Sequence, residues 1–205
     1  MYKKISQLIT HKFVTHGIIA EDDYEIYNYG FELLIALLST TIVIILISIF
    51  INKFVETILY LVGFFSVRAI CGGYHAKHHY TCFVATISSY LLFLLLNICF
   101  SSTTFLSLVA GVMTIVSSIL IIAFAPVEHP DNPMTAYRKS RNRSFSLLLT
   151  FVICIIYFLS LALENTLPYV FNYAIGIFLA ALAILTAKIE IVILKRKEER
   201  LWKRL

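Results

Sequence analysis

The sequence predicts an all-α, polytopic membrane protein with about six transmembrane helices and an N-terminal amphipathic helix at the membrane interface. Of its 205 residues, 60% are hydrophobic and only 14% are charged, and the mean hydropathy is +0.86. A soluble domain carries fewer apolar and more charged residues. Apolar stretches of about 20 residues, the length that a helix needs to cross a bilayer, recur along the chain. The charged residues gather in short segments between them.

Six hydrophobic segments are predicted to cross the membrane. In chain order they are Phe31–Phe50, Phe54–Val67, Phe83–Phe100, Phe105–Ala125, Phe145–Leu163 and Tyr169–Ala187. The second segment is the shortest and carries Glu56, so it must tilt, thin the bilayer or extend into the polar residues that follow. A re-entrant hairpin is the alternative there. We expect residues 1–205 to form a single integral membrane domain, with residues 31–194 as its transmembrane core.

The basic residues predict the topology. If both termini are cytoplasmic, Lys53 alone of the 17 lysines and arginines falls outside the cell. This bias is typical of a multi-pass cell-membrane protein with its basic segments inside. The same orientation places the Cys- and His-rich segment described below on the cytoplasmic side, where thiols stay reduced. Disulfides are therefore not expected.

The two chain ends are predicted to lie on the membrane surface. Residues 1–20 place Ile5, Leu8, Ile9 and Phe13 near one helical face, a pattern typical of an interfacial helix. Residues 195–205 form a basic cytoplasmic tail that continues the last helix. For both ends we favour membrane anchoring over substrate binding. The net charge of +5 therefore indicates anionic lipid as a partner rather than nucleic acid, because the basic groups sit beside the spans.

A polar segment, residues 68–83, interrupts this membrane-like sequence. It contains two cysteines and three histidines within twelve residues: Cys71, His75, His78, His79 and Cys82. Polar groups beside lipid cost free energy, so such a cluster predicts a functional site. A thiol and an imidazole together suggest a cysteine nucleophile at a membrane boundary. A wet polar cluster with no chemistry is the plainer alternative.

Helix geometry limits which of these residues can react together. His75 and Cys82 are seven residues apart, about 10 Å along a straight helix, whereas proton transfer needs about 3 Å. If they form the pair, the chain must bend between Gly72 and Cys82, and Gly72-Gly73 makes that bend feasible.

Other pairings have better helical spacing. His78 and His79 precede Cys82 by four and three residues, and spacing alone favours His78. Cys71 and His75 form another pair four residues apart. The residue pattern therefore leaves both the nucleophile and its base open.

Zinc chemistry and transport are the competing interpretations. A zinc set of two Cys and two His from this segment would span about 16 Å on a helix and could not converge on one ion without a sharply folded loop. No metal or other cofactor is therefore expected, although a zinc-dependent membrane hydrolase remains an alternative. An ion-coupled transporter or peptide-export component would need ionisable groups inside several spans. Here only Glu32 and Glu56 lie within spans, both near the ends.

Four residues of the polar segment resemble the AgrB family of membrane peptidases: Arg68, Gly73, His75 and Cys82, with six residues between the histidine and the cysteine. The chain length, the six-span hydropathy, the amphipathic N-terminus and the proline-rich segment 125–133 with the basic run after it are also similar. The resemblance implies a cysteine endopeptidase that removes the C-terminal part of a quorum-sensing propeptide, called AgrD in that family. It also implies that the product is closed into a thiolactone through an acyl-enzyme thioester.

The resemblance implies roles for individual residues. The family's catalytic cysteine and histidine map onto Cys82 and His75, and its arginine and glycine onto Arg68 and Gly73. We expect Arg68, Gly73 or Lys77 to bind substrate or stabilise the oxyanion. We expect the basic run to bind the acidic propeptide tail or anionic lipid through Arg138, Lys139, Arg141 and Arg143. A homodimer is also implied, and small residues in the last span, Ala180, Ala181 and Ala183, would allow close helix contact.

Overall fold

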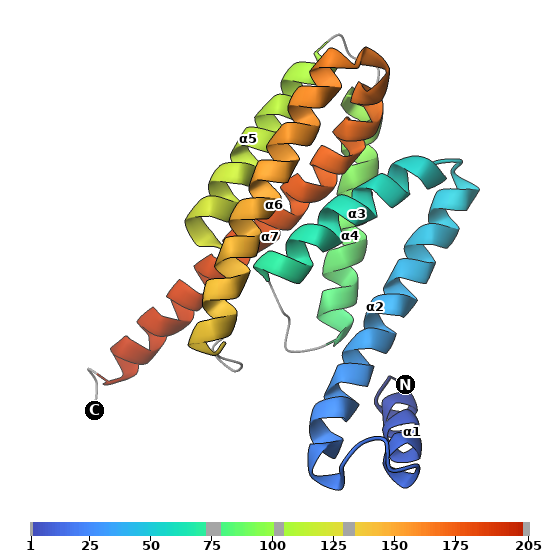
Figure 1. Ribbon diagram of the computed structural model, residues 1–205, viewed down its shortest axis with the longest axis vertical. Coiled ribbons are helices and arrows are strands. Elements are labelled where there is room, and N and C mark those ends of the chain that lie inside the picture. The colour runs from blue at the N-terminus through green and yellow to red at the C-terminus, as the bar shows by residue number, and fades with distance from the viewer. Residues whose placement is uncertain (1, 73–78, 101–104, 129–133, 203–205) are drawn as a thin grey trace. The chain divides into compact units, whose positions relative to one another are not determined.

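The computed structural model describes residues 2–72, 79–100, 105–128 and 134–202. Every regular element in these ranges is a helix, which confirms the all-α prediction (Figure 1). The long helices are α1 (Tyr2–Thr15), α2 (Tyr24–Phe50), α3 (Phe54–Cys71), α4 (His79–Phe100), α5 (Leu106–Phe124), α6 (Ala136–Ala162) and α7 (Leu167–Trp202). Two single 3₁₀ turns, Glu21–Asp23 and Glu164–Thr166, precede α2 and α7.

Six of these helices, α2 to α7, are long and apolar enough to cross a membrane, as the sequence predicts. The protein is therefore a multi-pass membrane protein. α3 is the least apolar of the six, with a mean hydropathy of 1.7 over 18 residues. It is nevertheless one continuous helix of about 27 Å at 1.5 Å per residue, close to the ~30 Å hydrocarbon core.

α6 begins well before the predicted span. It starts at Ala136, so the basic run of residues 138–143 belongs to its first turns rather than to a loop. Thr135 caps this helix, since its extended backbone lets the side-chain oxygen accept a hydrogen bond from the Arg138 N–H at 3.3 Å. Such a cap satisfies one of the otherwise unpaired N–H groups of the first turn. The capping threonine explains why the helix extends beyond its apolar part.

The helices form two compact units. One contains α1, α2 and the first part of α4 up to Ser88, and the other contains α3, the rest of α4 and α5 to α7. The prediction that the chain acts as a single domain stays a prediction.

In the first unit, α1 packs along α2 through small polar residues. Ser6 and Thr10 are fully buried, and their hydroxyls donate to carbonyls of α1 itself. Ser39 of α2 donates to the Tyr2 hydroxyl at 3.2 Å. Small side chains allow the two helices to approach closely. The apolar Leu8 of α1 is 69% exposed. The predicted amphipathic helix is thus present, and its position at the membrane interface stays a prediction.

In the second unit, α7 lies against both α3 and α5, and α6 packs on α5 (Figure 1). A fully buried aromatic cluster lies between α3 and α4, with the Tyr60 and Phe93 rings 4.5 Å apart and Tyr90 beside them. Hydrogen bonds between the hydroxyls of Tyr60 and Ser89 and between those of Tyr90 and Thr57, both 3.0 Å long, satisfy the two buried tyrosine hydroxyls.

One sequence-based argument about α7 is wrong. We expected Ala180, Ala181 and Ala183 to offer a small-residue face for a second copy of the chain. Ala180 and Ala181 are instead completely buried inside the second unit. Because α7 is enclosed by the protein's own helices there, these alanines serve packing within one chain. The homodimer itself stays a prediction without this support.

Candidate functional site

The polar segment begins where α3 ends. Cys71 is the last residue of α3, and Gly72 ends the helix with a φ of 74° and a ψ of −150°. Side-chain-bearing residues rarely adopt this conformation. The next helix, α4, begins at His79. α3 therefore ends at Cys71, and the spacing between His75 and Cys82 stays a prediction because it depends on residues 73–78, which lie outside the described residues.

Several predicted residues of this segment lie outside the described residues. They are Gly73, His75, Lys77 and His78. The pairing of His75 with Cys82 therefore stays a prediction, and so does the rival pairing with His78. The zinc alternative also depends on His75.

Cys82 lies in the first turn of α4 and is partly exposed. Its backbone carbonyl accepts a hydrogen bond from the Thr86 hydroxyl at 2.9 Å, within the same helix. The N-terminal turn of a helix carries partial positive charge, which favours an anionic group such as a thiolate. The partly exposed Cys82 thus lies at a helix N-terminus, and its role as nucleophile stays a prediction.

Cys71, the alternative nucleophile, is in a different environment. It is fully buried, and its thiol donates to the Ser146 hydroxyl at 3.3 Å across the contact between α3 and α6. Ser146 in turn donates to the Asn142 carbonyl at 2.8 Å. A thiol enclosed in this way packs two helices together and is closed to a peptide substrate. Of the two candidates that the sequence left open, burial favours Cys82.

Arg68 lies in the last turn of α3, about one turn before Cys71. It is half-buried, and its guanidinium carbon lies 5.8 Å from the centroid of the Phe64 ring. A cation near a helix C-terminus is favoured by the helix dipole, and the aromatic contact adds a weak cation–π attraction. The side chain thus lies at the edge of the polar segment, where it can serve as an anchor or contact a substrate.

Two of the four basic residues predicted to bind a substrate tail have partners within the protein. The Lys139 ammonium lies 2.8 Å from a carboxylate oxygen of Glu128. Arg143 donates through Nη1 to the carbonyls of Ile122, at 2.6 Å, and Ala125, at 2.7 Å. Both side chains therefore hold contacts within the protein, and their role in binding a substrate tail stays a prediction.

The other two basic residues are exposed on α6. The guanidinium carbon of Arg141 lies 5.9 Å from the ring of Tyr137, which is itself 74% exposed, and Arg138 is also exposed. An exposed pair of arginines separated by two residues presents positive charge to solvent. The role of Arg138 and Arg141 in binding a substrate tail stays a prediction.

Glu128 and Asp131 are the two carboxylates of the segment between α5 and α6. The hydrogen bond from Lys139, with the attraction of its charge, holds the pKa of Glu128 below its ordinary range. Glu128 is therefore a paired carboxylate at neutral pH, and its interaction with Lys139 gives it a structural role at the start of α6. Asp131 lies outside the described residues.

Sequence reasoning missed the contacts that fix the end of α3. The Val127 N–H donates to the Cys71 carbonyl at 3.0 Å. A Cβ added to Gly72 would lie only 2.9 Å from the Val127 carbonyl oxygen. The prolines around Val127 indicated a structured loop, but a sequence carries no signal for the partner of a single backbone N–H. The partner here is 56 residues away.

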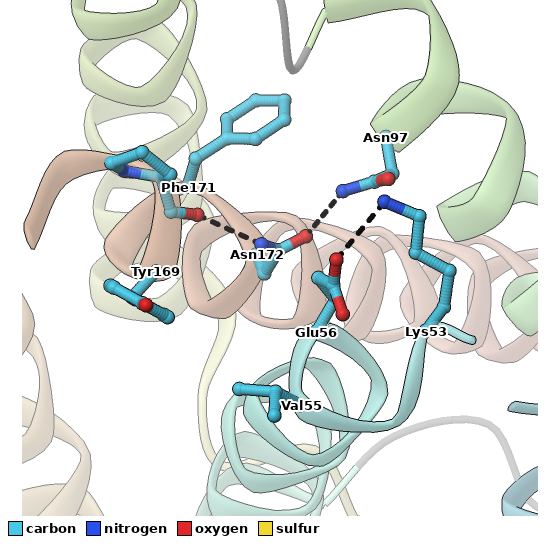
Figure 2. Close-up of a pocket in the computed structure, with 8 residues that line it drawn as sticks. Lys53, Val55, Glu56, Asn97, Tyr169, Phe171 and Asn172 are labelled. Atoms are coloured by element: carbon cyan, nitrogen blue, oxygen red, sulfur yellow. Dashed lines mark hydrogen bonds and ion pairs between the residues drawn. The ribbon is translucent and has the colours of Figure 1, made fainter. Parts of the chain in front are cut away.

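A cavity of about 380 Å³ lies at the opposite end of α3, where α7 also begins (Figure 2). Its lining residues are Lys53, Val55, Glu56, Asn97, Pro168, Tyr169, Phe171 and Asn172. Figure 2 shows that its polar groups pair with one another: Lys53 with Glu56 at 3.0 Å, and Asn97 with Asn172 at 2.7 Å. Asn172 also donates to the Pro168 carbonyl at 2.8 Å. These groups satisfy each other's hydrogen-bonding capacity. We therefore interpret the residues that line the cavity as a polar contact that joins α3, α4 and α7.

Comparison with known proteins extends the likeness beyond the polar segment. The family model for AgrB, accessory gene regulator B, matches residues 3–192. The chain belongs to the AgrB family. Accessory gene regulator protein B of Staphylococcus haemolyticus (strain JCSC1435) is 28% identical over 131 residues, which cover 64% of this chain and 68% of that protein. The protein of the same description in Staphylococcus aureus (strain MW2) is 24% identical over 156 residues, 76% of this chain and 79% of that protein. No solved structure matches the chain.

The AgrB match includes almost the whole described fold. It begins in α1 and ends in α7, so it spans the polar segment, Cys82 and the start of α6. The family resemblance inferred from four residues is therefore confirmed at the level of the family.

Proposed function

We propose that this AgrB-family protein is a membrane cysteine endopeptidase of a quorum-sensing system. In this proposal it removes the C-terminal part of an AgrD-like precursor peptide and helps to form a cyclic autoinducing peptide. The observation that carries the proposal is the contrast between the two thiols of the polar segment. Cys82 is partly exposed in the first turn of α4, whereas Cys71 is buried against Ser146. Family membership supplies the substrate class.

The proposed chemistry uses Cys82 as nucleophile and His75 as base. His75 takes the thiol proton, and the thiolate attacks the scissile carbonyl of the precursor. As the tetrahedral intermediate collapses, the C–N bond breaks and the C-terminal fragment leaves with the proton that His75 returns. A thioester then links Cys82 to the remaining peptide. The end of α3 at Cys71 is compatible with this pairing, which requires the chain to bend between Gly72 and Cys82.

Cyclisation follows from a thiol–thioester exchange. A thiol within the bound peptide attacks the thioester, forms the thiolactone and releases Cys82, which recovers a proton. Thioester and thiolactone are of similar energy, so exchange competes with hydrolysis if water is kept from the site. A location at the edge of a membrane span supports such exclusion.

Charge supports the recognition of the precursor. Arg138 and Arg141 remain available for an acidic peptide tail, and Arg68, Gly73 and Lys77 are the candidates for contacts near the scissile bond. Membrane lipids and a second copy of the chain are further proposed partners. The positive-inside distribution supports a cytoplasmic active site with both termini on the same side.

Co-expression with a tagged precursor tests the proposal. We expect cleavage with the wild type and with Cys71→Ser, and none with Cys82→Ser or His75→Ala. Hydroxylamine, which cleaves thioesters, should release a peptide from the trapped wild-type intermediate. Cleavage by Cys82→Ser together with loss of cleavage in Cys71→Ser would contradict the assignment of the nucleophile.

The same experiment distinguishes the alternatives. A zinc-dependent hydrolase would lose activity with a chelator and regain it with zinc. A transporter or export component without proteolytic activity would leave the precursor uncut in every variant. For tail binding, Arg138→Gln with Arg141→Gln should raise KM for a precursor with an acidic tail and leave a neutral-tail precursor unaffected.

A further inference from the structure

We propose that Val127 and Arg143 are positioning residues for this reaction, because they fix the point at which the chain leaves α3 for the segment that carries His75. This inference rests on the proposed function. It assigns Arg143 to the protein's own backbone rather than to the substrate tail. Three contacts link the end of α3 to the end of α5 and to α6.

The first contact holds the end of α3 itself. The last carbonyls of a helix have no partner within the helix, and here the Cys71 carbonyl accepts the Val127 N–H at 3.0 Å. Gly72 then leaves room for the Val127 carbonyl, which a Cβ would approach to 2.9 Å. Val127 is 7% exposed, so water offers the Cys71 carbonyl a poor substitute for this bond.

The second contact holds the segment that supplies Val127. Arg143 of α6 donates through one nitrogen, Nη1, to the carbonyls of Ile122 and Ala125. These carbonyls belong to the last turn of α5 and its C-cap. Charge-assisted hydrogen bonds are about twice as strong as neutral ones. Arg143 thereby ties the end of α5, two residues before Val127, to α6.

The third contact joins α3 to α6 directly. The buried Cys71 thiol donates to Ser146, which lies three residues after Arg143 and therefore about one turn further along α6. The ends of α3 and α5 and the first half of α6 are thus linked in a closed set of contacts within one compact unit. Loss of one contact should therefore weaken the set that holds the end of α3.

The chain connects these contacts to the reaction. His75 follows Gly72 by three residues, a span of at most about 11 Å, so a displaced Gly72 displaces the start of that short segment. Misplacing a reacting group by about 1 Å can lower the rate about 100-fold. Arg143 acts through this geometry and does not touch the reacting atoms.

The test measures the full-length protein in detergent, with Arg143→Met as the main variant. We expect kcat for precursor cleavage to fall about 10- to 100-fold, with KM within about twofold of the wild type, because position rather than binding is lost. We also expect the pH profile of Cys82 alkylation by iodoacetamide, read by peptide mass spectrometry, to move toward that of His75→Ala. Arg143→Lys should restore much of kcat, because a lysine ammonium can also donate to two carbonyls from one nitrogen.

Two further variants make the test decisive. Arg196→Met removes an exposed arginine near the end of α7 and should match the wild type. Gly72→Ala disturbs the same junction from the α3 side without changing charge, so it replaces Arg143→Met if that variant does not fold. It should lower kcat and move the alkylation profile in the same direction.

The outcomes separate this inference from the proposed function. If His75→Ala changes neither cleavage nor the alkylation profile, the proposed function fails. If His75→Ala changes both but Arg143→Met and Gly72→Ala leave the profile unchanged, the positioning role alone is overturned. A raised KM with unchanged kcat in Arg143→Met would overturn it as well, since that result assigns Arg143 to substrate binding.

Discussion

The crossing of α3 and α7 predicts a strong effect from adding a single methyl group. Gly63 of α3 and Gly176 of α7 let the two backbones approach each other. A Cβ on Gly63 would lie 2.5 Å from the Tyr173 carbonyl oxygen, and a Cβ on Gly176 would overlap the Tyr60 carbonyl oxygen. Both obstacles are backbone atoms, which cannot rotate away as a flexible side chain can. Gly63→Ala and Gly176→Ala should therefore force the helices apart.

The magnitude follows from that displacement. To give the new Cβ an ordinary contact of 3.4 Å at position 63, the helices must separate by about 0.9 Å. Overpacking of this kind costs about 1–3 kcal/mol, and alanine returns about 1 kcal/mol of helix propensity. We expect a net loss of up to about 2 kcal/mol for Gly63→Ala and at least as much for Gly176→Ala. At about 2–4 °C per kcal/mol for a chain of this size, Tm should fall by up to about 8 °C for Gly63→Ala.

Thermal stability in detergent, measured by size-exclusion chromatography of a fluorescent fusion, provides the assay. Gly30→Ala is the matched control, because Gly30 is also helical and nothing lies within 4 Å of its added Cβ. This control should be neutral or raise Tm. The double variant at positions 63 and 176 should cost less than the sum of the singles, because one separation relieves both clashes. An unchanged Tm in both single variants would refute the close crossing.

Three further predictions concern other contacts. Gly111→Ala should lower Tm because its Cβ would meet the Tyr157 hydroxyl, and adding Tyr157→Phe should restore part of that loss; additive losses would contradict the predicted clash. Asn97→Leu should destabilise by about 1 kcal/mol by orphaning its buried partner, and combining it with Asn172→Leu should cost less than the two single losses added together. For pH, the lowered pKa of Glu128 means that its ion pair stabilises the fold above the ordinary carboxyl range and that this contribution is lost as pH falls through the lowered pKa. A small Tm deficit of Glu128→Gln at neutral pH should therefore vanish in acid, whereas a deficit that persists in acid would argue against the charge.

The sequence predicts the number and type of the helices because membrane spans depend on length and hydropathy, both of which are local properties. Four of the six predicted spans lie wholly within their helices. Phe105–Ala125 exceeds α5 by one capping residue at each end, and Leu163, at the end of another predicted span, is the C-cap of α6. The early start of α6 escapes this reasoning because its first turns are polar. The burial of Ala180 cannot be predicted in this way either. A small residue that packs on a helix of the same chain has the same sequence pattern as one that packs on a second copy.

The candidate site shows the same division. The sequence identifies the polar segment and the need for a bend, since both follow from residue types and helical spacing. It leaves Cys71 and Cys82 equivalent, and only the packing of α3 on α6 separates the buried thiol from the accessible one. Likewise, charge counting groups Arg143 with Arg141. The two differ because one guanidinium reaches the carbonyls at the end of α5, which lie about 20 residues earlier.

The contacts of α3 fix the helix that precedes the polar segment. Lys53 and Glu56 pair at its start, Gly63 packs on the backbone of α7 at its middle, and Cys71 is bound by Val127 and Ser146 at its end. A helix held at three points along its length moves little when a substrate binds beside it. Pre-organised positions lower the barrier because less ordering remains to be done in the transition state.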